Sequence, residues 1–560
     1  MPKESVNWKI VGAAGLGIKS TGEVMAKALS RSGFYINGYT EYPSLIRGGH
    51  NTYQVLASES PVGGPRKELD VLVALNQDGI DFHKNEMNES TRLVADTGLD
   101  ASAVTAKIIQ IPILEKAKEL GNVIVQNVIA LGASAALMGI EAEVFLELIE
   151  EQFGKKKDLL EMNKQAFMAG YEAVGEEKET SIRKKVDQPR IVVSGSEAVG
   201  LGALTAGVQL YAAYPMTPST PVLHFLVEHQ EDYGMVVRQT EDEISAINMV
   251  IGASFAGAKV MTGTSGGGFA LMQEGVSLAG MLELPVVVML AMRPGPATGL
   301  PTWTGQGELR FAIHSGHGEF AKIILAPGDA VEAYELCYKA HELAQKYQTV
   351  VILLTDKLLA ESHYSVEKFI EFPSVKVLNI TDNPTKPEGE MFHRYQPTPN
   401  GVSDRTLPGI TEGYYVANSD EHGPEGLVDE TAEMREVMVN RRMAKHKAIL
   451  GEMLPPNTYG PEEAKITLVG FGSVKGSVLE AMKDIPDVNF VHFNHVWPLP
   501  EKAREMLEGR KLVFIENNMM GQFEGLVREQ LGLGALSSLR KDDGRPFYPD
   551  EIKDFVDKLI

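Results

Sequence analysis

The sequence predicts a multidomain α/β protein. Strand-like apolar runs alternate with helical patterns along most of the chain, which is the pattern of sheets covered by helices. The chain has 560 residues, enough for roughly three to five domains of about 100–200 residues each. A charged, apolar-poor stretch at residues 175–189 and a stretch rich in Pro, Gly and charge at 375–460 divide the alternating pattern.

The first part, residues 1–178, opens with a strand-like run, WKIVGAAG, that enters a glycine-rich turn. A helical pattern follows, and helical segments later fill residues 122–175. Further strand-like runs are YQVLAS, DVLVALN, TRLVADTG and AKIIQIPI. Apolar strands separated by helices predict an α/β domain with a mostly parallel sheet.

Two further α/β domains are predicted, at residues 190–365 and 464–560. The candidate strands of the first are RIVVSG, KVMTGT, LPVVVMLAM, AKIILAP and TVVILLTD, and those of the second are KITLVGFGS, NFVHFN and KLVFIEN. Residues 366–463 show weak periodicity between these domains, so we expect an extended connection with short elements there.

The composition excludes several classes of protein. A net charge of -22 repels phosphate backbones, which argues against a nucleic-acid partner. The single cysteine, Cys337, lies in a helical pattern typical of a core residue, and it excludes a disulfide framework or a four-thiolate iron–sulfur cluster within this chain. With no signal-peptide pattern and no uncharged apolar run of about 18 residues, we expect a cytoplasmic protein without a membrane partner.

The segment YPMTPST, residues 214–220, follows a strand-like run that ends at Ala213. Its prolines fix a strand-to-helix turn and hold Thr217 at the carboxyl end of a strand, where α/β folds bind ligands. The alternative is a rigid turn in which Ser219 or Thr220 caps the next helix. The pattern alone does not separate these interpretations.

Three acids, Glu241, Asp242 and Glu243, open a predicted helix whose apolar face begins at Ala246. Acids at a helix start favour the helix dipole, so capping is one interpretation. Glu243 directly precedes the apolar face, and a carboxylate that points inward needs a partner. The TGTSGGG segment, residues 262–268, follows the next strand-like run, and its glycines let a ligand approach the backbone closely.

Arg293 follows a nearly pure apolar run, LPVVVMLAM. An arginine at the end of a buried strand is costly unless an anion balances it, and a substrate carboxylate is such an anion. An internal salt bridge is the alternative. The glycine-rich loop through residues 295–318 is of the kind that often serves function, and it carries His314 and His317, which face either solvent or a ligand.

The N-terminal turn GAAGLG, which contains Gly12, Gly15 and Gly17, could cradle a phosphate at a helix N-terminus. It departs from the G-x-G-x-x-G fingerprint, and no acidic residue ends a suitable second strand about 20 residues on. A nicotinamide cofactor is therefore not expected.

Taken together, YPMTPST, TEDEISA with GTSGGG, AMRPGPATGLPT and GQGELRFAIHSGHGEF resemble the alpha chain of the 2-oxoacid:ferredoxin oxidoreductases. The N-terminal segment from GAAGLGIKSTGEVMAKALSRS to SLIRGGHNTYQV is similar to the gamma domain of that family. A fused gamma–alpha order resembles the two-subunit, 2-oxoglutarate-type members. The resemblance covers residues 7–355 and, more weakly, the C-terminal domain. It implies a gamma-type domain, then a pyrimidine-binding domain for thiamine diphosphate, then a transketolase C-terminal-like domain.

The resemblance also implies roles for individual residues. Glu243 matches the family glutamate that hydrogen-bonds N1′ of the aminopyrimidine and so favours formation of the ylid. Thr217, Arg293 and Thr302 match substrate-contacting positions, with the guanidinium clamping the carboxylate of the 2-oxoacid. The implied cofactor-binding residues are Tyr214, Pro215, Thr217, Glu243, Thr264, Gly267 and Gly268. The gamma-type domain implies a coenzyme A contact at Gly12, Gly15, Gly17 and Arg47, although Arg47 bridging two subunits is an alternative.

The chain lacks the Gly-Asp-Gly with a following asparagine pair that holds the diphosphate and its metal in the thiamine family. Asp542-Asp543-Gly544 has too little chain after it, and Asn517-Asn518 precedes it. The resemblance therefore implies no metal site here: Mg2+ and a [4Fe–4S] cluster belong to a partner beta subunit. We expect a dimer of alpha–beta heterodimers with ferredoxin as electron acceptor.

The expected reaction is oxidative decarboxylation of a 2-oxoacid, preferably 2-oxoglutarate, with coenzyme A to give acyl-coenzyme A, CO2 and reduced ferredoxin. An enzyme for a branched-chain or aryl 2-oxoacid, or for pyruvate, is the alternative within the family. A non-catalytic scaffold subunit is the alternative from another class. A self-sufficient decarboxylase is disfavoured by the missing diphosphate motif.

Overall fold

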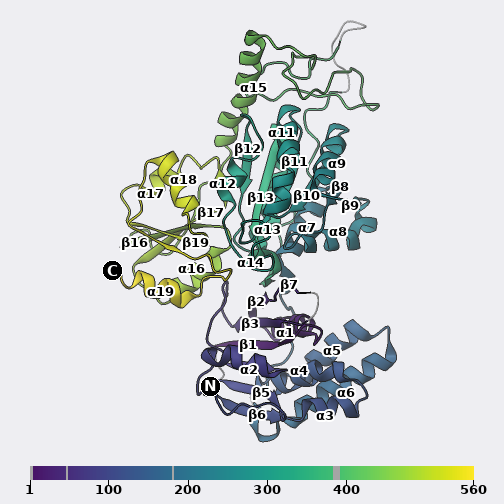
Figure 1. Cartoon of the computed structure of the whole chain (residues 1–560), viewed down its shortest axis with the longest axis vertical. Coiled ribbons are helices and arrows are strands. Elements are labelled where there is room, and N and C mark those ends of the chain that lie inside the picture. Colours follow the sequence, from purple (N-terminus) through teal and green to yellow (C-terminus); the bar gives the residue numbers. More distant parts are fainter. Residues whose placement is uncertain (1–3, 46–47, 180–181, 382–390) are drawn as a thin grey trace. The chain divides into compact units, whose positions relative to one another are not determined.

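The computed structural model describes residues 4–45, 48–179, 182–381 and 391–560. Arg47, one of the residues expected to contact coenzyme A, lies outside them. The chain divides into two compact units, which we describe one at a time (Figure 1). The first unit comprises Met1–Ser194, Glu361–Lys368 and Tyr548–Glu551, and the second comprises the rest.

The first unit is built on an eight-stranded sheet in the order β6-β5-β4-β1-β3-β2-β14-β7. Its strands are β1 (Ser5–Ala13), β2 (Tyr35–Glu41), β3 (His50–Ser58), β4 (Val71–Ala74), β5 (Arg92–Asp96), β6 (Lys107–Ile111), β7 (Ile191–Ser194) and β14 (His363–Val366). Its α-helices are α1 (Ile18–Arg31), α2 (Gln77–His83), α3 (Ile113–Glu119), α4 (Gln126–Leu137), α5 (Ala142–Phe153) and α6 (Lys157–Ala173). Short 3₁₀ turns lie at Lys84–Glu86, Val123–Val125 and Gly175–Glu177.

The predicted strands of the first part all join this sheet, but only three of its seven strand pairs are parallel. The pairs β1–β4, β4–β5 and β5–β6 are parallel, whereas β1–β3, β2–β3, β2–β14 and β7–β14 are antiparallel. The link from β2 to β3 is too short for the crossover helix that a parallel pair needs. The RIVVSG run, expected to open the second α/β domain, forms β7 and pairs with β14 at the edge of this first sheet.

Helices α4 and α6 pack at backbone contact because glycines face each other between them. A Cβ atom on Gly132 would lie 2.0 Å from the carbonyl oxygen of Phe167, and one on Gly170 would lie 1.8 Å from that of Ile129. Any larger residue would force the two helices apart.

The second unit contains a seven-stranded sheet in the order β18-β12-β13-β11-β10-β8-β9 and a five-stranded sheet in the order β15-β17-β16-β19-β20. Its strands are β8 (Leu210–Ala213), β9 (Val236–Gln239), β10 (Val260–Thr264), β11 (Val286–Met292), β12 (Lys322–Leu325), β13 (Val350–Asp356), β15 (Asn457–Tyr459), β16 (Ile466–Phe471), β17 (Val488–Phe493), β18 (His495–Trp497), β19 (Leu512–Glu516) and β20 (Ser537–Arg540). Its helices are α7 (Gly195–Ala206), α8 (Thr220–Tyr233), α9 (Glu243–Phe255), α10 (Gly266–Leu271), α11 (Gln273–Met281), α12 (Leu309–Ile313), α13 (Ala330–Tyr347), α14 (Lys357–Glu361), α15 (Ala432–Leu450), α16 (Val474–Met482), α17 (Ala503–Leu507), α18 (Gln522–Leu531) and α19 (Pro549–Val556).

The larger sheet is parallel from β9 to β12, and helices α7, α8, α9 and α11 pack around it (Figure 1). Strand β18 from the C-terminal part adds to its edge antiparallel to β12. One continuous apolar core contains Val250, Val288 and Phe471. The predicted core residue Cys337 is fully buried on α13. The described helices include none long and apolar enough to cross a bilayer.

Helix α15 corrects the expectation of only short elements between residues 366 and 463, because it is 19 residues long. The sequence shows little apolar periodicity here because several buried positions of the helix are basic. Arg441, Arg442 and Lys445 are each at most 5% exposed. Arg441 and Lys445 both pair with Glu283, which follows α11. A search for apolar periodicity does not detect a helix whose buried face is charged.

Candidate active site

The three motif segments meet at one edge of the larger sheet. Strands β8, β10 and β11 are parallel neighbours, so their carboxyl ends lie together. The YPMTPST segment leaves β8, the glycine turn leaves β10, and Arg293 follows β11. This edge is where parallel α/β sheets bind ligands.

Glu243 is a buried carboxylate that its own helix does not use as a cap. Asp242 caps α9, because its Oδ1 accepts a hydrogen bond from the backbone N–H of Ser245 at 2.7 Å. The side chain of Glu243 is free to point inward, and the residue is 2% exposed. Among the described residues nothing hydrogen-bonds its Oε1. A buried carboxylate oxygen without a donor is costly, which points to a ligand that supplies one.

The turn after β10 brings Thr264 and Gly268 against Glu243. A Cβ atom on Gly268 would lie 2.3 Å from Oε1 of Glu243 and 2.2 Å from Oγ1 of Thr264, so only glycine fits there. A Cβ atom on Gly267 would meet nothing within 4 Å, so that position faces open space. The Oγ1 of Thr264 lies 3.8 Å from the sulfur of Met216, which connects this turn to the YPMTPST segment.

Arg293 and Thr217 are in direct contact. The Nη1 of Arg293 donates a hydrogen bond to the carbonyl oxygen of Thr217 at 2.6 Å. Arg293 is 8% exposed, and burial lowers the pKa of its guanidinium although the charge of Glu308 opposes this. Within the described part of the chain, no carboxylate lies within ion-pair distance of it. The internal salt bridge considered for this arginine is therefore absent there, and the guanidinium keeps donors for an anion.

Glu308 is a member of this cluster that the sequence analysis missed. A Cβ atom on Gly266 would lie 1.8 Å from its Oε1, so the carboxyl packs directly against the glycine turn. Its Oε2 is buried without a hydrogen-bond partner in the described residues. Burial raises the pKa of Glu308 to about 8, against the opposing charge of Arg293. No spacing in the sequence relates positions 266, 293 and 308, so only the fold reveals the group.

The other sequence-predicted site residues lie on segments that adjoin this cluster along the chain. Thr302 is buried in the loop between β11 and α12, and Tyr214 is 39% exposed beside Pro215. His314 and His317 are exposed on the loop around α12.

The C-terminal part contacts the loop between β11 and α12 through Gln306. The backbone N–H of Gln306 donates to the carbonyl oxygen of Asn517 at 2.7 Å, and Asn518 Nδ2 donates to the carbonyl oxygen of Gln306 at 3.3 Å. Thr304 N–H donates to the carbonyl oxygen of Gly544 at 3.0 Å. The asparagine pair and the Asp-Asp-Gly segment, which do not fit a diphosphate motif, thus position the loop that carries Glu308.

The first unit contains a separate cavity of about 320 Å³ beside the glycine-rich turn. Gly15 and Gly17 line it together with Ser20, and Gly17 has φ 71° at the start of α1. Asn127 donates to Thr21 Oγ1 at 2.9 Å on the same wall. Gly12 instead packs beside Ile18, Leu16 and Leu75. The cavity therefore combines helix N–H groups with an apolar interior.

The cluster in the second unit fits half of a thiamine diphosphate. An unpartnered buried carboxylate suits the N1′ of an aminopyrimidine, and the glycine turn leaves room for a flat ring. The described residues contain no group of three or more His, Cys, Asp or Glu side chains that could hold a metal ion.

Comparison with known families gives two matches. Residues 201–440 match the family described as "Pyruvate flavodoxin/ferredoxin oxidoreductase, thiamine diP-bdg", and residues 7–173 match "Pyruvate ferredoxin/flavodoxin oxidoreductase". The cluster around Glu243 lies inside the first of these, and the glycine-rich turn lies inside the second.

Similar proteins extend over the whole chain. The alpha subunit of a 2-oxoacid:ferredoxin oxidoreductase from Aeropyrum pernix is 31% identical and covers 98% of this chain and 97% of its own length. One from Sulfolobus sp is 30% identical and covers 99% and 97%. A solved structure, the 2-oxoglutarate:ferredoxin oxidoreductase of Magnetococcus marinus with 2-oxoglutarate, coenzyme A and succinyl-CoA bound, is 30% identical, with a TM-score of 0.89 over 99% of both chains. The chain therefore belongs to the 2-oxoacid:ferredoxin oxidoreductase family, as an alpha subunit.

Proposed function

We propose that this subunit, together with a beta subunit, converts 2-oxoglutarate and coenzyme A to succinyl-coenzyme A and CO2 while reducing ferredoxin. The observation that carries the proposal is the Glu243 carboxylate, buried at 2% exposure with an oxygen that no described residue satisfies. When bound, thiamine diphosphate supplies the carbanion and the electron sink for such a decarboxylation. The chain's part is to position the reactants and tune charge around them.

Glu243 would hold the pyrimidine half of the cofactor by a hydrogen bond to N1′. Its inward orientation depends on Asp242, which caps α9 in its place. Thr264, Gly267 and Gly268 would form the wall against the ring, with Tyr214 and Pro215 at its edge. The low exposure of Glu243 strengthens its hydrogen bond to a ligand, because little water competes for the carboxylate.

Arg293 would clamp the carboxylate next to the keto group of the substrate. Its contact with the Thr217 carbonyl fixes the guanidinium and leaves further donors for a bidentate bond. Glu308 would remain protonated near neutral pH and so would not neutralise the arginine before the substrate binds, since burial raises its pKa to about 8. Thr302 would complete this side of the site.

Coenzyme A would contact the glycine-rich turn through Gly15 and Gly17, which line the cavity of about 320 Å³ in the first unit. The beta subunit would supply Mg2+, the diphosphate site and the [4Fe–4S] cluster, from which electrons pass singly to ferredoxin. The dimer of heterodimers is part of the same proposal.

The choice of 2-oxoglutarate is supported by the relatives. The Magnetococcus marinus protein, similar along the whole chain, is described with 2-oxoglutarate and succinyl-CoA bound. A subunit of 2-oxoglutarate synthase from Methanothermobacter marburgensis is 32% identical over 64% of this chain.

The test is a steady-state assay of the chain purified with its beta subunit, with 2-oxoglutarate, pyruvate and 2-oxoisovalerate as substrates. We expect kcat/KM for 2-oxoglutarate to exceed that for the others by at least about tenfold, because one hydrogen bond to a charged group contributes about 1.5–3 kcal/mol. Equal or faster turnover of 2-oxoisovalerate or pyruvate would contradict the substrate choice. Absence of turnover with all three, in a complex that binds thiamine diphosphate, would favour a scaffold role.

A further inference from the structure

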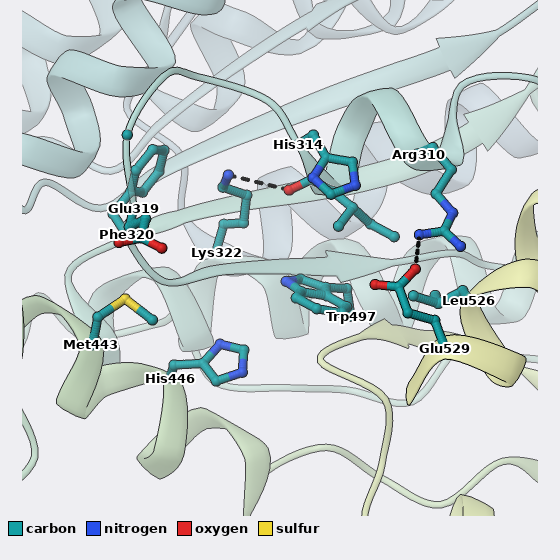
Figure 2. A pocket seen from close by; sticks show the side chains of 12 residues that line it. Arg310, His314, Glu319, Phe320, Lys322, Met443, His446, Trp497, Leu526 and Glu529 are labelled. Atoms are coloured by element: carbon teal, nitrogen blue, oxygen red, sulfur yellow. Dashed lines mark hydrogen bonds and ion pairs between the residues drawn. The ribbon is translucent and has the colours of Figure 1, made fainter. Parts of the chain in front are cut away.

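The second unit contains a cavity of about 310 Å³ that Glu243 does not line. None of the roles proposed above uses it. Figure 2 shows it between the loop around α12, strands β12 and β18, and helices α15 and α18. Lys322 lies between Phe320 and His314 with its amino group directed toward the loop around α12, and Trp497 and His446 lie on the other side of its stem (Figure 2). A volume near 300 Å³ is in the range of small-molecule sites.

Lys322 is a buried cation whose charge no acid balances. The residue is 6% exposed, and burial lowers its pKa to about 8. Its Nζ makes two hydrogen bonds, to the carbonyl oxygens of Ser315 at 2.6 Å and Ile313 at 3.3 Å. In the described ranges no carboxylate comes within ion-pair distance of this Nζ. The Phe320 ring, 4.3 Å away, offsets only part of the cost.

A second buried lysine, Lys259, has an acceptor for each N–H donor of its ammonium group. Lys259, 8% exposed, donates to the carbonyl oxygens of Ala206 at 2.9 Å and Val375 at 2.6 Å, and to Ser374 Oγ at 3.0 Å. These three acceptors match the three N–H donors of an ammonium group. Lys322 lines the cavity and has two such acceptors among the described residues, one fewer than its N–H donors.

The other charged groups around the cavity do not neutralise Lys322. Arg310 and Glu529 satisfy each other, with Nη1 and Oε2 2.7 Å apart. Glu319 is exposed at the rim (Figure 2). Burial lowers the pKa of His446, so its ring is a neutral partner at physiological pH.

The rest of the wall is largely apolar and includes two rings tilted by 50°. Trp497 and His446 lie with ring centroids 5.8 Å apart, and Phe320, Met443 and Leu526 also line the cavity. Such a wall suits a planar or branched hydrocarbon body. A phosphate would need more donors than one ammonium, since Arg310 is engaged and α12 is only five residues long.

We propose that this cavity binds a small monocarboxylic acid with a flat apolar body, whose carboxylate pairs with Lys322 and whose body packs between Phe320, Trp497 and His446. The site is distinct from the cluster around Arg293.

The probe for the test is 4-fluorophenylacetate, observed by 19F relaxation in the presence of the chain purified with its partner subunit. We expect saturable line broadening, at least about tenfold weaker binding of the uncharged 4-fluorophenylacetamide, and no competition by acetate, which lacks the body. Equal binding of the amide, or no binding of the acid at millimolar concentration, overturns the proposal.

Variants test where the probe binds. Lys322→Met should weaken binding at least about tenfold, whereas Lys259→Met, a matched loss of another buried lysine, should not. Because Lys322→Met risks misfolding, Met443→Trp offers a second test by filling the cavity from the exposed side of α15. Val437→Trp, at another exposed position of α15, is its control.

The result must also separate this cavity from the substrate site. Arg293→Met should leave binding of the probe within about twofold of the unmodified complex, because sites that share no contacts behave independently. Loss of binding in Arg293→Met, or unchanged binding in a folded Met443→Trp, would show that the probe sits elsewhere and would sink the proposal.

Discussion

Two carboxylates of the second unit, Glu243 and Glu283, are equally buried, at 2% exposure each, and yet differ in every contact. Glu283 pairs with Arg441 and, at 2.5 Å, with Lys445 of α15. Burial alone would raise its pKa, but these two charges outweigh burial and lower it to about 2. The Oε1 of Glu243 has no partner in the described chain. Equal burial is therefore accompanied by charge neutralisation at Glu283 and by an unpartnered oxygen at Glu243.

The largest effect on activity is expected from a substitution at Glu243. In Glu243→Gln we expect turnover of the complex to fall by about 10²–10⁴-fold, because the amide cannot act as the carboxylate does toward N1′. The melting temperature should stay the same or rise, since a buried oxygen without a hydrogen-bond donor contributes nothing to stability. Steady-state assays and thermal unfolding measure both, with the exposed Glu241→Gln as control. Unimpaired turnover would refute the catalytic role of Glu243.

The reverse outcome is expected at Glu283. Glu283→Gln should lower the free energy of unfolding by about 3–5 kcal/mol, because Arg441 and Lys445 would remain buried without their counter-charge. Urea unfolding measures this, and turnover per folded molecule should hold within about twofold. Asp487→Asn, at an exposed pair with Lys465, should change stability by no more than about 1 kcal/mol. A Glu283→Gln protein as stable as its parent would show that the ion pairs of Glu283 do not stabilise the fold.

Glu308 sharpens the comparison through pH. Its pKa of about 8 in the folded chain exceeds the ordinary 4.5, so the folded state holds an extra proton between these values. Stability then falls as pH rises from about 5 to 8. Glu308→Gln should abolish this component, on the order of 2 kcal/mol after allowance for partial exposure. Unfolding free energies at pH 5, 6.5 and 8 test it, with the exposed Glu319→Gln as control. Parallel pH profiles for parent and Glu308→Gln would contradict the assignment.

The smallest effect is expected at Asp242, which caps α9 and leaves Glu243 free to turn inward. Asp242→Ala removes the acceptor for the Ser245 N–H and should cost about 1 kcal/mol of stability. Glu241→Ala, one residue earlier and exposed, should cost little. If both variants unfold at the same denaturant concentration, the Asp242 cap does not stabilise α9.

The fold class and most of the candidate site could be predicted from the sequence because the signals are local. An apolar run followed by YPMTPST or by GTSGGG predicts that a strand ends in a turn. Parallel strands bring such ends together at one edge of the sheet. This logic placed Thr217 and Arg293 at strand ends, whereas Thr264 was singled out only through the family resemblance. The domain boundaries and the roles of these residues remain predictions.

What the sequence by itself determined is the alternation of strands and helices and the identity of the residues at the strand ends. The tertiary structure decided which buried charges have partners, because ion-pair partners such as Glu283 and Lys445 are distant in sequence. The packing of Glu308 against Gly266 also joins residues that are distant in sequence. It also decided that β7 joins the first sheet and that α15 is a helix with a basic buried face. Local patterns report hydrophobicity, whereas the pairing of charges depends on distances that only folding sets.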